Sequence, residues 1–225
     1  MTETSVVSQD GWTMRVRPGS NQLSHRLFVL LHGWTGNEDV MWIFTRQIPP
    51  DYWIISPRGP VSAPEGGFGW FPAGNAPIPM IAELQPVIEQ VLNTIDRWAQ
   101  SNHVNSSQLT IMGFSQGAML AYAITLLFPH RVNGVAALAG YLPEKWMDSN
   151  NKSTLAGKPF YIAHGTQDTT VPVSLARQTV QFLEGAGARV TYCESEVCHK
   201  LSMGCLHGLE NFFLNLPSPD QGNKP

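Results

Sequence analysis

Three residue types suited to nucleophilic catalysis occur in this chain in the order serine, aspartate, histidine. Ser115 lies at the centre of Gly-Phe-Ser-Gln-Gly at residues 113–117, which has the form G-x-S-x-G. A serine hydroxyl becomes a good nucleophile when a neutral imidazole takes its proton, and the imidazole needs a carboxylate on its second nitrogen. We therefore expect Ser115 to be the nucleophile, His199 the general base and Asp168 the carboxylate that orients it.

The residues around Ser115 predict the strand-to-helix turn that this chemistry requires. Residues 109–112 are apolar and β-prone, whereas residues 117–128 are rich in Ala and Leu and stop before Pro129. Small residues at both ends allow a strained turn that exposes the hydroxyl, and the following helix directs its unpaired N–H groups at developing negative charge. The alternative is a glycine-flanked turn with an idle serine, which the flanking strand and helix disfavour.

Asp168 and His199 each follow a predicted strand. The apolar run 159–163 leads into the loop that presents Asp168, and residues 188–193 alternate like a strand before the loop that carries His199. Parallel sheets build their sites at the carboxyl ends of the strands. We therefore expect both side chains at the sheet edge where Ser115 lies.

Other histidines and other roles are the alternatives for these assignments. His207 is the rival base, but it falls within 203–214, whose apolar spacing predicts a helix and so a packed or surface histidine. For Asp168 the alternative is a loop aspartate that only shapes its turn. His32 and His164 both precede glycine at strand ends, and we expect each to brace its loop rather than to act in catalysis.

An oxyanion hole should be formed by two backbone N–H groups. Gln116 supplies the first by its position after the nucleophile. The apolar strand 27–31 runs into a loop with glycines on either side of Trp34, so Trp34 is expected to supply the second.

The segment 58–79 is rich in Gly and Pro and is too long for an ordinary connection. We expect its aromatic residues Phe68, Trp70 and Phe71, together with the Trp34 ring, to bind substrate as walls of an acyl groove. The alternative is that Trp70 and Phe71 only anchor the segment to the body of the protein. The remaining length leaves no room for a large cap domain, which favours an open groove and small or medium esters.

Five motifs in order along the chain resemble the phospholipase/carboxylesterase family of α/β-hydrolases, which includes bacterial carboxylesterases and acyl-protein thioesterases. They are Leu-His-Gly-Trp-Thr-Gly at 31–36, Pro-Arg-Gly-Pro at 57–60, Gly-Trp-Phe at 69–71, Gly-Phe-Ser-Gln-Gly-Ala at 113–118, and His-Gly-Thr-Gln-Asp at 164–168 with Val171-Pro172.

The resemblance implies an α/β-hydrolase fold, a triad of Ser115, Asp168 and His199, and oxyanion donors at Trp34 and Gln116. Two positions depart from the family pattern. Trp34 stands where the acyl-protein thioesterases usually have leucine, which bears on substrate preference. Cys198 replaces the glycine before the histidine and is followed by Lys200, which bears on the assignment of the base.

Composition predicts one α/β domain over residues 1–216 and a disordered tail over 217–225. The 225 residues are 43% hydrophobic and 14% charged, which suffices for a substantial core. Strands alternate with helices, one beginning at Pro86 and another near Val173, so we expect a mostly parallel sheet with helices on both faces.

Charge and hydropathy narrow the partners. The net charge of -3 provides no cationic surface for nucleic acid or for an anionic membrane. The amino terminus lacks the pattern of a secretory signal, and the longest apolar region, 118–128, is too short for stable membrane insertion, so we expect a cytoplasmic enzyme. The oligomeric state stays open.

Three cysteines, Cys193, Cys198 and Cys205, flank the predicted base. Reduced thiols are the expectation for an odd number of cysteines without an extracellular context. A disulfide between nearby members and a zinc site that includes His199 and His207 are the alternatives. Zinc on His199 would remove the neutral base, and the spacing lacks a C-x-x-C pair, so no metal is expected.

These patterns together predict a serine carboxylesterase that acts on a small-molecule ester or thioester through an acyl-serine intermediate, without a cofactor. Within enzymes the alternatives are an acyl-protein thioesterase or a lysophospholipase. From another class, the alternative is a catalytically silent binding protein on a hydrolase scaffold, against which the complete set of triad residue types argues.

Overall fold

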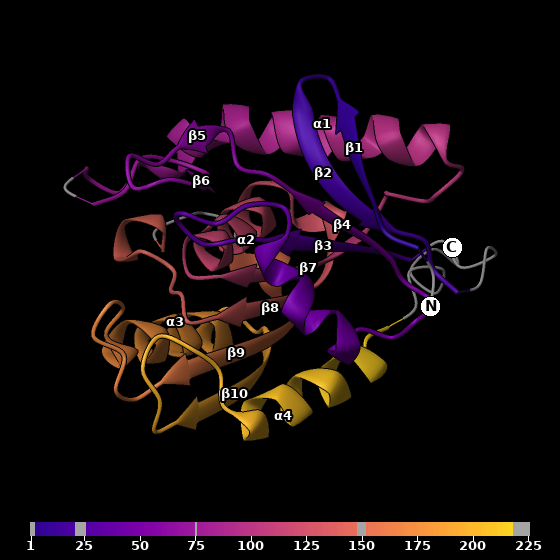
Figure 1. Cartoon of the computed structure of the whole chain (residues 1–225). Helices are drawn as coiled ribbons and strands as arrows, with labels where there is room; N and C mark the ends of the chain where they lie inside the picture. Colours follow the sequence, from indigo (N-terminus) through magenta and orange to yellow (C-terminus); the bar gives the residue numbers. More distant parts are fainter. Residues whose placement is uncertain (1–2, 21–25, 75, 148–151, 218–225) are drawn as a thin grey trace.

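The computed structural model describes residues 3–20, 26–74, 76–147 and 152–217. Their central element is an eight-stranded sheet with the order β1-β2-β4-β3-β7-β8-β9-β10 (Figure 1). β1 and β2 pair antiparallel, as do β2 and β4, and the other neighbours pair parallel. The strands are β1 (Ser5–Gln9), β2 (Trp12–Arg17), β3 (Leu27–Leu31), β4 (Trp53–Pro57), β7 (Leu109–Phe114), β8 (Val132–Leu138), β9 (Pro159–Gly165) and β10 (Arg189–Ser195).

Helices cover both faces of this sheet, as predicted. The helices are α1 (Gln85–Ser101), α2 (Gln116–Leu127), α3 (Val173–Gly185), α4 (Met203–Leu214) and the 3-10 helix η1 (Val40–Gln47). Buried residues of α1, α2 and α3 share one hydrophobic cluster, whereas η1 and α4 contribute to a second cluster. Figure 1 shows η1 and α4 on the same side of the sheet. Short 3-10 turns complete the chain at η2 (Ile81–Leu84), η3 (Pro129–Arg131), η4 (Glu144–Trp146) and η5 (Lys152–Leu155).

The continuous apolar sequence of β3 follows from its place in the sheet. Leu27, Val29 and Leu31 face the first cluster, and Phe28 and Leu30 face the second. Because side chains alternate along a strand, a strand covered on both faces needs apolar residues at every position. In α1, the apolar residues that recur at helical spacing, Ile88, Val91, Leu92, Ile95 and Trp98, are likewise buried.

The amino-terminal hairpin of β1 and β2 was not predicted. Its turn is formed by Asp10 and Gly11, both with positive φ (52° and 82°). An Asp-Gly pair between β-prone residues is a recognised hairpin signal, because both turn positions require positive φ. The signal was therefore present in the sequence.

Segment 58–79 contains the short antiparallel pair β5 (Val61–Ser62) and β6 (Phe68–Gly69), and its described residues form no cap domain. Of the predicted tail, only Pro217 is described, and its carbonyl accepts a hydrogen bond from the Asn133 side chain at 3.2 Å. Over the described ranges, no helix has the length and apolar character needed to cross a bilayer.

Candidate active site

Ser115 occupies the turn between β7 and α2, with backbone angles of φ 53° and ψ -115°. This conformation is strained for a residue with a side chain, and such strain is found where a nucleophile must project from a turn. The two glycines of the motif are required by close backbone approach. A Cβ on Gly113 would lie 2.2 Å from the Gly117 carbonyl oxygen, and one on Gly117 would lie 2.1 Å from the Leu31 carbonyl oxygen.

Asp168 and His199 form the pair predicted from the sequence. The imidazole Nδ1 lies 2.7 Å from Oδ2 of Asp168, a charge-assisted hydrogen bond. The other carboxylate oxygen, Oδ1, accepts hydrogen bonds from the N–H groups of Thr170 and Val171, both at 2.9 Å. With Nδ1 donating to Asp168, Nε2 of His199 is left to act as the proton acceptor.

The environment of Asp168 favours its ionised form. Burial by itself raises the pKa of this carboxyl, but the hydrogen bonds from the Val171 N–H, from His199 and from the Thr170 N–H outweigh burial and hold the pKa below its ordinary value. His164 is a further neighbour, with Nε2 3.4 Å from Oδ2 of Asp168. A carboxylate that stays charged can stabilise the imidazolium formed during catalysis.

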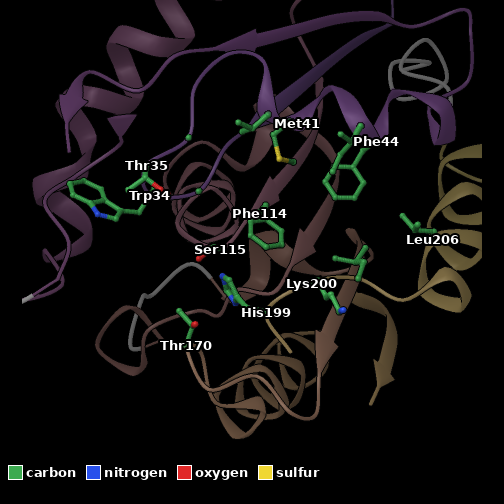
Figure 2. Close-up of a pocket in the computed structure, with 15 residues that line it drawn as sticks. Trp34, Thr35, Met41, Phe44, Phe114, Ser115, Thr170, His199, Lys200 and Leu206 are labelled. Atoms are coloured by element: carbon green, nitrogen blue, oxygen red, sulfur yellow. Dashed lines mark hydrogen bonds between the residues drawn. The ribbon is translucent and has the colours of Figure 1, made fainter. Parts of the chain in front are cut away.

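Ser115 and His199 line one cavity of about 620 Å³ (Figure 2). The ring of Phe114, the residue before the nucleophile, packs edge-on against the His199 imidazole with centroids 5.0 Å apart. The structure thus brings Ser115, His199 and Asp168 together at the carboxyl ends of β7, β9 and β10. The roles of these three residues in catalysis stay a prediction.

The predicted oxyanion loop lies directly against the nucleophile. A Cβ on Gly33 would be 3.3 Å from Cβ of Ser115, which sets the loop of Trp34 beside the turn. Gln116 is the first residue of α2, where backbone N–H groups have no carbonyl partner within the helix. Both residues therefore lie beside the nucleophile turn, and their role as oxyanion donors stays a prediction.

The Gln116 side chain also fastens segment 58–79 to this turn. Its Oε1 accepts a hydrogen bond from the Trp70 N–H at 2.8 Å, and its Nε2 donates to the Phe71 carbonyl at 2.7 Å. Trp70 Nε1 in turn donates to the His32 carbonyl at 2.7 Å. One buried network therefore connects the nucleophile turn, the oxyanion loop and segment 58–79.

His32 completes this network as a neutral imidazole. Its Nδ1 donates to the Gly33 carbonyl at 2.7 Å, and its Nε2 accepts from the Gly59 N–H at 2.8 Å. Burial is the main cause that lowers the pKa of His32. Protonation would remove the acceptor for Gly59, so His32 braces the loop as predicted.

His164 is buried, and its Nε2 donates to the Val171 carbonyl at 2.8 Å, which braces the Asp168 loop. Its Nδ1 has no hydrogen-bond partner within the described chain, so the expected bracing is only half satisfied. His207 lies on α4 and is exposed, outside the cavity lining. The structure therefore favours His199 over His207 as the base.

The predicted substrate walls are placed differently. Trp70 and Phe71 are buried in the hydrophobic core, with Trp70 only 1% exposed, and neither they nor Phe68 line the cavity. Phe68 lies beneath the Arg58 guanidinium, 4.7 Å from its ring centroid. Trp70 and Phe71 therefore anchor segment 58–79 to the protein, which was the alternative to a groove wall for these two residues.

Trp34 lines the cavity, but its indole does not narrow the apolar end. A Cβ on Gly69 would lie 2.2 Å from Cε3 of Trp34, so the ring rests on the backbone of segment 58–79. Figure 2 shows the indole directed away from Met41, Phe44 and Phe114. The expectation that this ring restricts the acyl groove is therefore wrong for this cavity.

The apolar lining comes instead from residues that sequence reasoning missed. They belong to η1, to the residue before the nucleophile, to the loop after the predicted base and to α4, namely Val40, Met41, Ile43, Phe44, Phe114, Leu201 and Leu206. The available signal was the run of apolar residues 40–44 directly after the predicted oxyanion loop.

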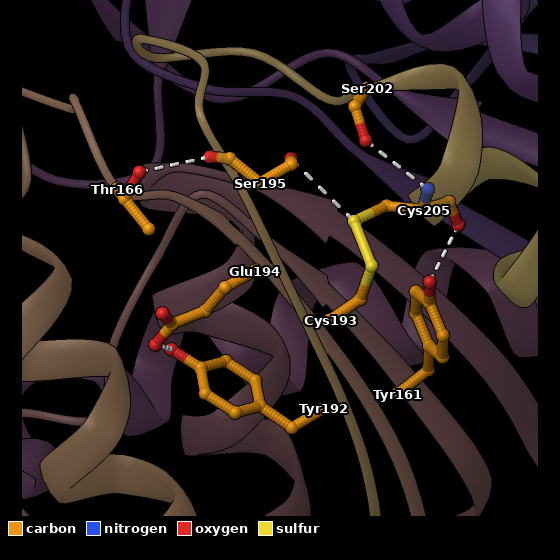
Figure 3. Close-up of a disulfide and its surroundings, with 8 residues drawn as sticks. All are labelled: Tyr161, Thr166, Tyr192, Cys193, Glu194, Ser195, Ser202 and Cys205. Carbon is orange, nitrogen blue, oxygen red and sulfur yellow. Dashed lines mark hydrogen bonds between the residues drawn. A yellow bond between two sulfur atoms is a disulfide. The ribbon is translucent and has the colours of Figure 1, made fainter.

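The expectation of three reduced thiols is wrong for two of the cysteines. Cys193 on β10 and Cys205 on α4 form a disulfide with Cα atoms 5.8 Å apart (Figure 3). Cys198 is a free, exposed thiol beside His199. Disulfide sulfurs cannot serve as thiolate ligands, and within the described ranges no group of three or more His, Cys, Asp or Glu side chains is placed to hold a metal ion.

Comparison with known proteins agrees with this geometry. A probable inactive carboxylesterase of rice (Oryza sativa subsp. japonica) is 28% identical over 71% of this chain and 65% of its own length. Acyl-protein thioesterase 1 of Saccharomyces cerevisiae is 31% identical over 41% of this chain, which spans 43% of that relative. The Bacillus cereus carboxylesterase structure superimposes with a TM-score of 0.80 at 22% identity, covering 91% of this chain and 94% of that one, which shows the α/β-hydrolase fold. Residues 16–215 match the Phospholipase/Carboxylesterase family, and the chain belongs to that family.

Proposed function

We propose that this protein is a serine carboxylesterase that hydrolyses small to medium esters or thioesters through an acyl-serine intermediate. The observation that carries the proposal is the 2.7 Å bond from His199 to the ionised Asp168, with His199 and Ser115 lining the same cavity. Family membership supports esterase or thioesterase chemistry at this site.

In the acylation step, Oγ of Ser115 forms a bond to the substrate carbonyl carbon while its proton passes to Nε2 of His199. The bond to the alcohol or thiol then breaks, and the leaving group takes the proton from the imidazolium. Asp168 stabilises the cation between these transfers without accepting the proton. A water molecule repeats the sequence on the acyl-serine and releases the acid.

The negative charge on the carbonyl oxygen requires donors fixed in advance. We assign this role to the backbone N–H groups of Gln116 and Trp34, supported by the contact between the Gly33 loop and Ser115. The hydrogen bonds of Gln116 and His32 hold that loop and the nucleophile turn in fixed positions relative to each other. Losing one backbone donor of this kind costs about 10²-fold or more in kcat.

A fluorophosphonate probe tests the proposal, because it reacts only with an activated serine. The wild-type protein should be labelled at Ser115, and Ser115→Ala should not be labelled. Absence of labelling in the folded wild-type protein would favour the alternative of a catalytically silent binding protein. The rice relative, named a probable inactive carboxylesterase, makes this alternative worth testing.

The kind of substrate is also part of this proposal. Acyl-protein thioesterase and lysophospholipase activities are the alternatives within the same chemistry, and the yeast relative supports the first of them. Comparison of p-nitrophenyl esters with acyl-cysteine peptides separates these cases. The cytoplasmic location stays a prediction, and the disulfide weighs against it because such bonds are rare in reducing compartments.

A further inference from the structure

We propose that the apolar end of the cavity, between η1 and α4, holds the hydrocarbon chain of the substrate and sets its preferred length. This inference rests on the proposed function. It places the chain on the side of the site opposite to the Trp34 indole (Figure 2).

The apolar end is built as a slot with a buried floor and an exposed rim. Met41 and Phe44 of η1 form the floor, with exposed fractions of 2% and 8%. Half-buried side chains of Phe114, Leu201 and Leu206 line it further. At the rim, Ile43 is 73% exposed and Val40 44% exposed.

The chemistry of this lining favours a hydrocarbon chain over a polar one. Figure 2 shows the polar side chains of Ser115, His199 and Thr170 at the other end of the cavity. Towards η1 and α4 the lining side chains are apolar, apart from the exposed Lys200. A chain that starts at the reacting carbonyl can therefore extend over Phe114 and remove the apolar rim from water, whereas a charged chain would lose its hydration there.

The slot is also continuous with the nucleophile. Phe114 precedes Ser115 in the chain and packs against His199, so the slot begins at the reacting atoms. Each methylene that enters it should raise kcat/KM about fourfold, until the chain passes the rim and further carbons remain in water.

The hydrocarbon chain can belong to the acyl or to the alcohol part of the ester, and two substrate series distinguish these cases. One series varies the acyl group from acetate to decanoate with a p-nitrophenyl leaving group. The other varies an alkyl alcohol with a fixed acetyl group. Leu206→Trp, which fills the slot from α4, should lower the long-to-short ratio of kcat/KM at least tenfold in one series, equivalent to the loss of about two methylenes.

Two further variants keep the result interpretable. Leu214→Trp on the same helix is the control, because Leu214 is 65% exposed and does not line the cavity, and it should leave both series unchanged. Ile43→Asp changes only an exposed rim residue, so it retains the fold, and its carboxylate should penalise long chains selectively. Unchanged length ratios in both series for Leu206→Trp and Ile43→Asp would overturn the inference.

A binding experiment separates this inference from the proposed function. Decanoate should displace the fluorescent probe 1-anilinonaphthalene-8-sulfonate from Ser115→Ala, and adding Leu206→Trp should weaken decanoate at least tenfold. If Leu206→Trp weakens decanoate binding but the wild-type protein hydrolyses no ester, the proposed esterase function is refuted and the hydrocarbon-binding site is supported. If the wild-type protein hydrolyses esters but the added Leu206→Trp leaves decanoate binding unchanged, the hydrocarbon-binding site is refuted and the esterase function is supported.

Discussion

Breaking the Cys193–Cys205 disulfide should lower the stability of this protein far more than its catalytic rate. The bond joins β10 to α4 and closes a loop with a sequence separation of 12, which includes His199. Its removal enlarges the conformational entropy of the unfolded chain. For a loop of this size the loss is about 3 kcal/mol, which for a chain of this length lowers Tm by roughly 6–12 °C.

We expect the catalytic rate to change little because backbone hydrogen bonds also hold the His199 loop to the residues after β9. The Thr166 N–H donates to the Ser195 carbonyl at 2.8 Å, and the Gln167 N–H donates to the Val197 carbonyl at 3.1 Å. The 2.7 Å bond to Asp168 then fixes the imidazole itself. We expect kcat to remain within about threefold of wild type at 25 °C, where the folded state still dominates.

Cys193→Ala is the variant for this test, because it breaks the bond and leaves the buried Cys205 in place. Thermal unfolding and initial rates are measured for it, for wild type with and without dithiothreitol, and for Cys198→Ser as a control whose disulfide is intact. Thiol titration of the native wild-type protein should find one reactive thiol. A drop in kcat of a hundredfold with little change in Tm would refute the reasoning, since it would make the disulfide the main support of His199.

Further predictions concern the base, the indole and a buried histidine. His199→Ala should lower kcat by about 10³-fold or more, with little further loss when Ser115→Ala is added, whereas His207→Ala should retain normal initial rates; the reverse pattern would reassign the base. Trp34→Leu should leave the ranking of acyl chain lengths unchanged, because the ring rests on segment 58–79, and a clear gain for long chains would show that it does narrow the site. Burial lowers the pKa of His32 in the folded state, so the unfolded chain binds more protons than the folded one. The stability that neutral His32 contributes is therefore present above about pH 6.5 and is lost as the pH falls towards the pKa of the folded state. The decrease of Tm with acid in that window should therefore be smaller in His32→Gln, and equal slopes would exclude His32 as its source.

The placement of Ser115, Asp168 and His199 could be predicted because its signals are local. The G-x-S-x-G turn of Ser115 needs only the strand before it and the helix after it, and both appear in the sequence as periodic segments. Asp168 and His199 lie in loops directly after β9 and β10, and parallel pairing brings those loops to one edge. Local pattern and sheet topology together therefore determine where these three side chains lie.

The substrate side could not be predicted because it depends on contacts between distant segments. The Trp34 ring is directed by the backbone of Gly69, and Trp70 is buried through hydrogen bonds to Gln116 and His32. The slot forms only because η1 and α4, far apart in sequence, cover the same face of the sheet. The sequence pattern therefore predicts a groove wall from aromatic residues of which Trp70 and Phe71 anchor the segment instead.

The pairing of the cysteines could not be predicted for a similar reason. Cys193 and Cys205 both contact the cluster under α4, Cys193 from the sheet and Cys205 from the helix. Which cysteines meet depends on how α4 lies over β10, and spacing alone leaves that choice open.

Trapping the acyl-enzyme tests the central claim most directly. The wild-type protein is mixed with a p-nitrophenyl ester, quenched in acid within the first turnover, digested and examined by mass spectrometry. We predict that the acyl mass is found on Ser115, and that it is absent from Ser115→Ala. Acylation found instead on Cys198 or Lys200, the two nucleophilic side chains that flank His199, with Ser115 unmodified, would contradict the account.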